Sequence, residues 1–275
     1  MPLRAYYRPS SWADALALLD SAAPLLIGPR PRALDALDAE AAVDLSALDL
    51  AYIREMDDGA IHIGALTTLQ AIADSPALCS RASALLPVAA VEAAHPGLRQ
   101  LATLAGALAS PEGPPELWLA LLALDATVVT RGVDGERETA IADFRPAGGA
   151  LVSEARIAGW TAQAVGALER LSRTPRDQAI VAAACALVVE GGEVSRARLA
   201  LADGGPPRRV SAIAPLLEGR PLDAERLAQT ARFCADAAQP LSDFRASADY
   251  RRAMAGVLAR RALAAAWTHA MESSR

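Results

Sequence analysis

Three tight-turn signals, each lying between two strand-like runs, constrain the fold of this chain most strongly. They are Asp58-Gly59, Asp134-Gly135 and Gly191-Gly192. Such pairs connect antiparallel strands in two-residue turns, because glycine and aspartate tolerate the backbone angles that these turns need. Between the turns the chain carries Ala- and Leu-rich runs with helical spacing. The sequence therefore predicts an α+β protein with antiparallel sheets.

The first 54 residues predict a small α/β lobe with parallel strand pairing. Ser11 can cap a helix that begins with Trp12, and the apolar runs 23–28 and 41–48 read as short strands. Residues 55–165 predict a second, mixed lobe in which Thr67 or Thr68 caps a helix that stops before Pro76.

The character of the sequence changes after Trp160. Two strand-like runs flank Gly191-Gly192, and the rest is largely helical, with a last helix that begins at Ser247 or Asp249. We therefore expect two domains, residues 1–165 and 166–275.

Composition excludes several classes of function. Hydrophobic residues make up 53% of the 275 residues and the net charge is −5, so neither nucleic acid nor an anionic membrane is expected as main partner. The chain has no lysine, which excludes a Schiff-base lysine and a Walker-type phosphate loop. Cys79, Cys185 and Cys234 match no metal-ligand spacing, so we expect no metal. No signal peptide or membrane span is evident, and a cytoplasmic location is expected.

Several segments, in this order, resemble the FAD-binding middle subunit of molybdenum hydroxylases, the carbon monoxide and xanthine dehydrogenase family. They are YYRPSSWADALALL, IHIGALTTLQAIADSP, HPGLRQLATLAGALA, LLALDATV and PLSDFRASADYRRAMAGVLARRAL. The resemblance covers nearly the whole chain, and its C-terminal segment is the most specific part.

The resemblance implies a fold and a role. The two N-terminal lobes would form an FAD-binding-type domain, followed by a C-terminal α+β domain with a three-stranded antiparallel sheet and helices. In that family the subunit is an oxidoreductase component that relays electrons. The organic substrate is oxidised at the molybdenum cofactor of a large subunit. The electrons then pass through the clusters of an iron–sulfur small subunit to FAD, and from FAD to an acceptor. The absence of cluster-spaced cysteines here agrees with that division of labour.

The first FAD loop of the family departs from its usual Ala-Gly-Gly-Thr pattern. It reads Ile27-Gly28-Pro29-Arg30-Pro31, in which only Gly28 matches and two prolines lack the N–H groups that would bind a diphosphate. Losing two hydrogen bonds to a charged group would cost about 3–6 kcal/mol, or on the order of 10²–10⁴ in affinity. Arg30 and Arg32 either compensate by pairing with phosphate or lie on a solvated loop.

The second loop, Thr103-Leu104-Ala105-Gly106-Ala107, stands where the family has Thr-Ile-Gly-Gly-Asn. The resemblance implies that its first four residues contact the cofactor, together with Thr68, Arg99 and Glu116. Glu116 occupies a position where the family usually has Asp.

His95, just before this loop, could act as an acid or base, but with no paired nucleophile a helix-end role is expected.

These departures leave three functional hypotheses open. One is a working flavoprotein subunit that binds FAD through what remains of both loops. Another is a flavin-free descendant that serves as a scaffold or assembly subunit. Binding of another anionic ligand at Arg30 and Arg32 is a third.

Overall fold

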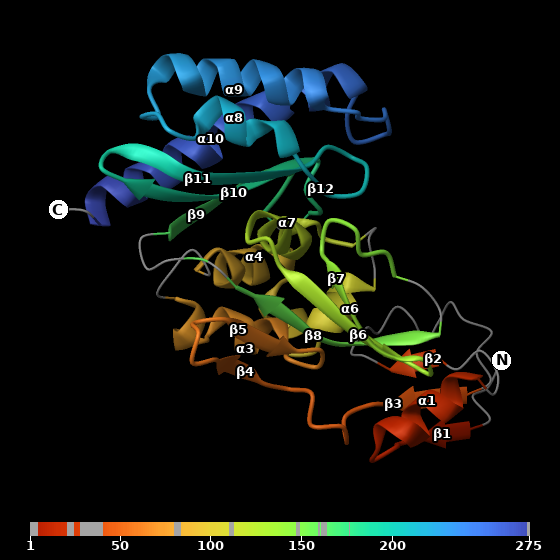
Figure 1. The fold of residues 1–275 in the computed structure, drawn as a ribbon. Helices are drawn as coiled ribbons and strands as arrows, with labels where there is room; N and C mark the ends of the chain where they lie inside the picture. Colours follow the sequence, from red (N-terminus) through yellow and green to blue (C-terminus); the bar gives the residue numbers. More distant parts are fainter. Residues whose placement is uncertain are drawn as a thin grey trace.

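A computed structural model gives the fold of the chain (Figure 1). It describes residues 5–20, 25–27, 41–79, 84–109, 113–146, 149–158, 160, 164–175 and 177–273. The strands in these ranges form three sheets, and the predicted α+β class is confirmed.

The N-terminal lobe has a three-stranded parallel sheet of order β1-β3-β2, as its sequence predicted. The elements are β1 (Ala5–Tyr7), α1 (Trp12–Asp20), β2 (Leu25–Ile27) and β3 (Ala41–Asp44). Ser11 begins α1, because its hydroxyl accepts a hydrogen bond from the N–H of Asp14 at 3.1 Å.

The second lobe is built on a five-stranded antiparallel sheet of order β4-β5-β8-β6-β7. Its strands are β4 (Ile53–Glu55), β5 (Ile61–Gly64), β6 (Thr127–Gly132), β7 (Gly135–Ala140) and β8 (Ala150–Ile157). Its helical elements are α3 (Leu69–Ala73), η1 (Pro76–Leu78), α4 (Leu85–Ala93), α5 (Pro96–Arg99), α6 (Leu104–Leu108) and α7 (Glu116–Ala123). The turns before β5 and β7 place Gly59 and Gly135 at φ of 79° and 105°, where glycine carries no steric cost.

The C-terminal domain has an antiparallel sheet of order β12-β11-β10-β9. Its elements are β9 (Ala164–Leu171), β10 (Val181–Glu190), β11 (Glu193–Ala202), β12 (Arg208–Arg209), η3 (Ser211–Ile213), α8 (Ala214–Leu217), α9 (Ala224–Ala237) and α10 (Ala248–Ser273). The resemblance implied three strands; the structure adds β12, a two-residue fourth strand paired to the end of β11. Gly191 and Gly192, both at positive φ, form the turn between β10 and β11.

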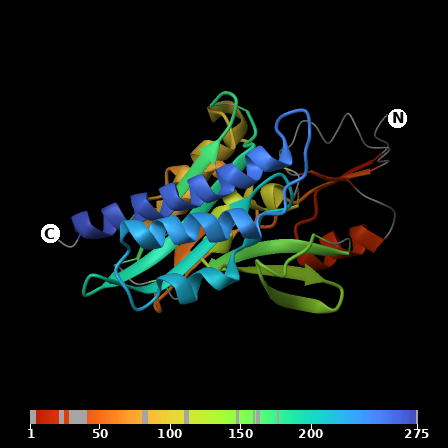
Figure 2. The same cartoon turned by 90° about the horizontal axis from the view of Figure 1, so that it is seen from above.

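Strand β10 is buried on both faces up to its last residue, which explains why its first nine residues, VAAACALVV, are an unbroken apolar run. One face packs under α10, and the other, which carries Ala182 and Ala184, joins the core that contains α7. The sheet is thus a layer between α8–α10 on one side and α4 and α7 on the other (Figure 1), and the view from above shows the long blue helices lying across it (Figure 2). The small alanines let α7 approach the sheet closely.

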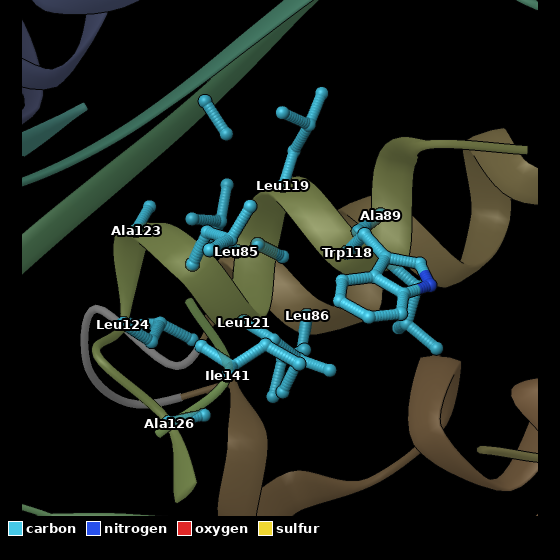
Figure 3. Close-up of a cluster of buried hydrophobic side chains, with 14 of the residues drawn as sticks. Leu85, Leu86, Ala89, Trp118, Leu119, Leu121, Ala123, Leu124, Ala126 and Ile141 are labelled. Carbon is cyan, nitrogen blue, oxygen red and sulfur yellow. The ribbon is translucent and has the colours of Figure 1, made fainter. Parts of the chain in front are cut away.

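Helix α7 is buried along its whole length and forms the centre of the second lobe. Figure 3 shows its side chains packed against those of α4, with Leu86 beside Leu121. This core includes residues of the C-terminal sheet and therefore extends across the contact between the two domains, while a second cluster fills the space between that sheet and α10. Burial of such Leu side chains contributes about 1.5–3 kcal/mol each.

An ion-pair cluster also joins the domains at the end of α7. Asp125, at φ of 57°, pairs with Arg209, and its Oδ2 lies 3.5 Å from Arg196 Nη2 and from Arg198 Nε. Partial burial raises the pKa of Asp125, but the three guanidinium groups outweigh burial and hold the pKa below its ordinary value. Arg196 also stacks over the ring of Trp160, 4.3 Å from its centroid.

Candidate functional site

A cavity of about 900 Å³ lies between the N-terminal lobe, α6 and the β6–β7 hairpin. This volume falls in the upper part of the range for small-molecule sites, about 300–1,000 Å³. The lining residues come from the first lobe, the turn after β5, the second loop with α6, the β6–β7 hairpin and the segment that leads into β8. They are Leu45, Ala65, Leu66, Thr103, Ala105, Gly106, Ala109, Thr130, Gly132, Val133, Asp134, Gly135, Glu136, Arg137, Thr139, Asp143, Phe144, Arg145, Pro146, Gly149, Ala150, Leu151 and Val152.

The second loop is held rigidly in the cavity wall. The N–H of Leu104 donates to the carbonyl of Thr67 at 3.0 Å, and the N–H of Ala105 donates to that of Ala65 at 2.9 Å. Thr103 begins α6 as its cap: its Oγ1 accepts from the N–H of Gly106 at 3.2 Å. These bonds tie the loop to the end of β5 and fix its orientation toward the cavity.

Trp118 fixes the loop from behind. Its Nε1 donates to the carbonyl of Ala107 at 3.1 Å, and its ring stacks on Phe144 with centroids 6.0 Å apart. Figure 3 shows the Trp118 indole on α7, at the edge of the buried cluster. Because Phe144 lines the cavity, Trp118 connects the central core to two parts of the cavity wall.

The N–H groups of residues 104–107 in the second loop all donate hydrogen bonds inside the chain. Besides the three bonds above, the N–H of Ala107 donates to the carbonyl of Thr103 at 3.0 Å. The loop in this conformation therefore offers none of the N–H groups of residues 104–107 to a diphosphate. A Cβ at position 106 would lie 3.2 Å from Thr103 Oγ1, so glycine there serves the close approach of the cap.

Among the described residues, two arginines line the cavity: Arg137 on β7 and Arg145 in the segment between β7 and β8. Arg145 is held by hydrogen bonds from its Nη1 to the carbonyls of Ala142 and Phe144, at 3.0 and 2.7 Å. Arg137 has no ion-pair partner among the described residues. Carboxylates line the cavity as well, among them Glu136.

Glu136 is neutralised by two arginines outside the cavity lining. Its Oε2 lies 2.9 Å from Arg131 Nη2, and its Oε1 lies 3.5 Å from Arg156 Nη2. The cavity thus fits FAD in volume and in its apolar lining, but the backbone of the second loop does not fit a diphosphate. The groups that bind the phosphates of FAD would have to be positively charged side chains.

The structure brings only part of the predicted cofactor-binding set to the cavity. Thr103, Ala105 and Gly106 line it, while Leu104 points into the core. Ile27 ends β2, and the predicted cofactor contacts of Gly28, Arg30 and Arg32 concern residues outside the described ranges.

Thr68 and Arg99 have structural partners close to the cavity. Thr68 Oγ1 accepts from the N–H of Ala71 at 3.1 Å and begins α3, and Thr68 also forms an isolated bridge with Thr103. Arg99 donates to Gln70 Oε1 at 3.0 Å and to the carbonyl of Ala94 at 3.0 Å. Neither is among the residues that line the cavity, and their contact with a cofactor remains a prediction.

His95 has the helix-end role that its sequence context predicted. Its Nδ1 accepts a hydrogen bond from the N–H of Leu98 at 3.3 Å and caps α5.

Glu116 is fully buried at the start of α7 and faces the C-terminal domain. Its Oε1 lies 2.9 Å from Nε of Arg170 on β9, and Arg170 Nη1 also reaches Glu92 at 3.2 Å. Burial raises the pKa of the Glu116 carboxyl, and nearby Arg170 offsets only part of that rise. The structure thus gives Glu116 a role in joining the domains, and it is not among the residues that line the cavity.

Sequence reasoning missed Trp118 and Arg145 as parts of the site. No local pattern marks them, because each belongs to the cavity through the packing of α7 and the segment before β8. Within the described ranges, no three His, Cys, Asp or Glu side chains gather to hold a metal ion. Likewise, none of the described helices is long and apolar enough to cross a bilayer.

Comparison with known proteins gives this architecture a family. Residues 2–154 match the "FAD binding domain in molybdopterin dehydrogenase", and residues 166–266 match the "CO dehydrogenase flavoprotein C-terminal domain". The carbon monoxide dehydrogenase medium chain of Afipia carboxidovorans is 31% identical, over 94% of this chain and 94% of its own length. The corresponding chain of Hydrogenophaga pseudoflava is 30% identical over 95% and 96%.

Solved structures agree with the sequence relatives. A chain of the carbon monoxide dehydrogenase of Hydrogenophaga pseudoflava matches with a TM-score of 0.89 at 28% identity, over 97% of this chain and 98% of that one. The family match covers both domains in the order in which the sequence resemblance placed them. The chain therefore belongs to the family of FAD-binding medium subunits of molybdenum hydroxylases.

Proposed function

We propose that the chain is the flavoprotein subunit of a molybdenum hydroxylase-type oxidoreductase. The observation that carries this proposal is the cavity of about 900 Å³, with Thr103 and Gly106 of the second loop in its wall. FAD, when bound, would pass electrons between one-electron iron–sulfur clusters and an acceptor. The chain's own part is to hold FAD, exclude water from its ring system and dock to the electron donor.

The apolar part of the wall suits the flavin ring. Ala65, Leu66, Leu151, Val152 and Phe144 present carbon surface to the cavity. The rigid second loop, braced by Trp118, would hold one edge of the ligand. Because the N–H groups of residues 104–107 are hydrogen-bonded internally, the phosphates of FAD would be bound by Arg137 and Arg145 or by residues 28–32. Two charged groups of this kind would make the affinity for FAD about 10²-fold or more higher than in a site without them.

The partners implied by this role are an iron–sulfur small subunit and a molybdenum-cofactor large subunit. In support, the relatives include the "Nicotine 6-hydroxylase medium subunit" and the "Nicotinate dehydrogenase FAD-subunit", whose names describe parts of larger complexes. Free Cys79, Cys185 and Cys234 are consistent with a cytoplasmic, reducing location.

A flavin-free scaffold is the second candidate. Two observations favour it: the prolines at positions 29 and 31, and the internal hydrogen bonding of all four N–H groups in residues 104–107. Both remove backbone donors that a diphosphate would use. The same fold and partners would serve this role without electron transfer.

Titration of the purified chain with FAD and, separately, riboflavin separates the two candidates. Flavin fluorescence and the visible spectrum are followed up to about 100 μM ligand, or about −5.5 kcal/mol on the standard scale. The flavoprotein proposal predicts saturable one-to-one binding of FAD with a perturbed flavin band, and weaker binding of riboflavin because it lacks the phosphates. A folded chain that binds neither ligand would contradict the proposal and support the scaffold.

A further inference from the structure

The loop between α9 and α10, residues 238–247, exposes two large apolar side chains. Leu241 is 74% exposed and Phe244 is 91% exposed, the highest values among the large hydrophobic residues described. Figure 1 shows this loop in blue, beyond the ends of both helices and at the margin of the C-terminal domain. Two large apolar side chains exposed to this degree, three residues apart on one loop, mark the loop as a candidate protein interaction site.

A fixed backbone holds these side chains outward. The carboxylate of Asp243 accepts hydrogen bonds from the N–H groups of Arg245 and Ala246, at 2.8 and 3.1 Å. It also accepts from Nη2 of Arg251 at 2.5 Å. Partial loss of water raises the pKa of Asp243, but these hydrogen bonds outweigh that effect and hold the pKa well below its usual range. Phe244, between two anchored residues, is therefore preorganised for contact.

Arg251 anchors the loop to the sheet beneath it. Its side chain is completely buried, and its Nη1 donates to the carbonyl of Ile180 at 3.1 Å, just before β10. The exposed residues thus stand on a rigid base, as the central residues of strong interfaces do.

A cavity of about 380 Å³ lies directly beside Phe244. It is large enough to receive side chains of a partner. Its lining residues are Arg173, Asp177, Gln178, Ile180, Phe244 and Arg245. Knobs of apolar surface next to a hollow favour specific docking over loose association.

The charge of this region is opposite to that of the chain as a whole. Among the charged side chains that line the hollow, Arg173 and Arg245 face a single carboxylate, that of Asp177, which leaves an excess of one positive charge. Arg173 pairs with no carboxylate among the described residues. The whole chain carries −5. An acidic partner surface would therefore be attracted to this region more than the net charge of the whole chain would suggest.

The same region bridges the two domains. Arg245 Nη1 donates to Gln178 Oε1 at 3.2 Å, and Gln178 Nε2 donates to the carbonyl of Gly113 at 3.1 Å. Gly113 lies just before α7, the helix whose Trp118 braces the cavity loop. A partner seated on the loop would contact a surface fixed relative to the candidate flavin cavity.

We propose that Leu241, Phe244 and the adjoining hollow dock a partner subunit that presents an apolar side chain flanked by carboxylates. This inference rests on the proposed function, because it supplies a docking surface for the complex proposed there. It commits to a protein subunit, since apolar contacts combined with one excess cation do not suit a nucleic acid.

The test is purification of the tagged full chain from its own cells, as wild type, Phe244→Asp and Val88→Asp. Val88 is also exposed but lies on α4, so it is the matched control. Mass spectrometry measures the amounts of co-purified iron–sulfur and molybdenum subunits relative to the chain. We expect Phe244→Asp to lose a co-purified subunit by about tenfold or more, as for a central interface residue. Val88→Asp and the conservative Phe244→Leu should retain it.

A photo-crosslinker at position 244 identifies the contact. The expected product joins the chain to an iron–sulfur or molybdenum subunit, at a peptide containing Asp or Glu. A crosslink to a second copy of the chain would overturn the inference, as would full recovery of the subunits with Phe244→Asp. Wild type that brings no such subunit would instead overturn the proposed function together with the inference. Circular dichroism of each variant checks that it folds.

Discussion

Replacing Gly204 with alanine should destabilise the C-terminal domain through the anchor of the α9–α10 loop. Gly204 has φ of 106°, which side chains rarely adopt. A new Cβ would overlap Nη1 of Arg251 and lie 3.0 Å from its Cζ. Arg251 cannot swing into water, because it is completely buried and held by Asp243 and the carbonyl of Ile180.

Two costs set the size of the effect. The backbone strain of alanine at this φ amounts to about 1–3 kcal/mol. Displacing Arg251 from the Ile180 carbonyl leaves a buried donor unsatisfied, at about 1–3 kcal/mol. We therefore expect the free energy of unfolding to fall by about 2–6 kcal/mol, a large share of the 5–15 kcal/mol or so that holds a domain together.

Urea unfolding followed by circular dichroism measures this difference, with Gly205→Ala as the matched control. A Cβ at Gly205 would meet no atom within 4 Å, and we expect that variant to stay within about 0.5 kcal/mol of wild type. Equal, small effects of the two substitutions would refute the reasoning, because they would show that Arg251 moves aside without cost.

Three further substitutions test the account. Asp203→Asn should lower stability at neutral pH, because hydrogen bonds from Arg208, at 2.8 Å to each oxygen, outweigh burial and depress the Asp203 pKa. That contribution is present above the unfolded pKa of about 3.9 and is lost as pH falls through the folded pKa, so the gap to wild type in urea unfolding should close in acid. Glu116→Gln should become more stable relative to wild type as pH rises from about 4.3 through the raised folded pKa, because wild type then has to ionise a buried carboxyl. If the difference in unfolding free energy between variant and wild type stays the same from about pH 4 to 8, burial is not the cause of the raised pKa. Trp118→Phe removes the bond to Ala107 and should weaken FAD about 2–10-fold, measured by fluorescence titration; unchanged affinity would show that the loop needs no brace.

Local signals in the sequence predicted much of the fold. Glycine-containing turns at Gly59, Gly135 and Gly191 appear where expected, because positive φ restricts such positions to few residue types. Ser247 begins the last helix: its Oγ accepts from the N–H of Tyr250 at 3.2 Å. Caps and turns depend on neighbours within a few residues, so one sequence suffices to find them.

The candidate site depended more on tertiary packing. The second loop was located correctly by motif, but the internal use of its N–H groups arises from the carbonyls of Ala65 and Thr67, some 40 residues earlier. Glu116 follows the loop closely in sequence, yet its partner Arg170 comes from another domain. Contacts between residues so far apart in the sequence produce no periodic or local pattern that could be recognised in one sequence.

Hydrogen–deuterium exchange with and without FAD tests the central claim most directly, namely that the cavity binds FAD without the backbone donors of the second loop. At about 100 μM FAD, where a micromolar site is nearly saturated, we predict new protection in β6, β7 and the segment before β8. The amides of residues 104–107 should already exchange slowly and should not change. New protection at 104–107 on adding FAD would contradict the claim about the donors. No change anywhere in a folded chain would contradict FAD binding itself.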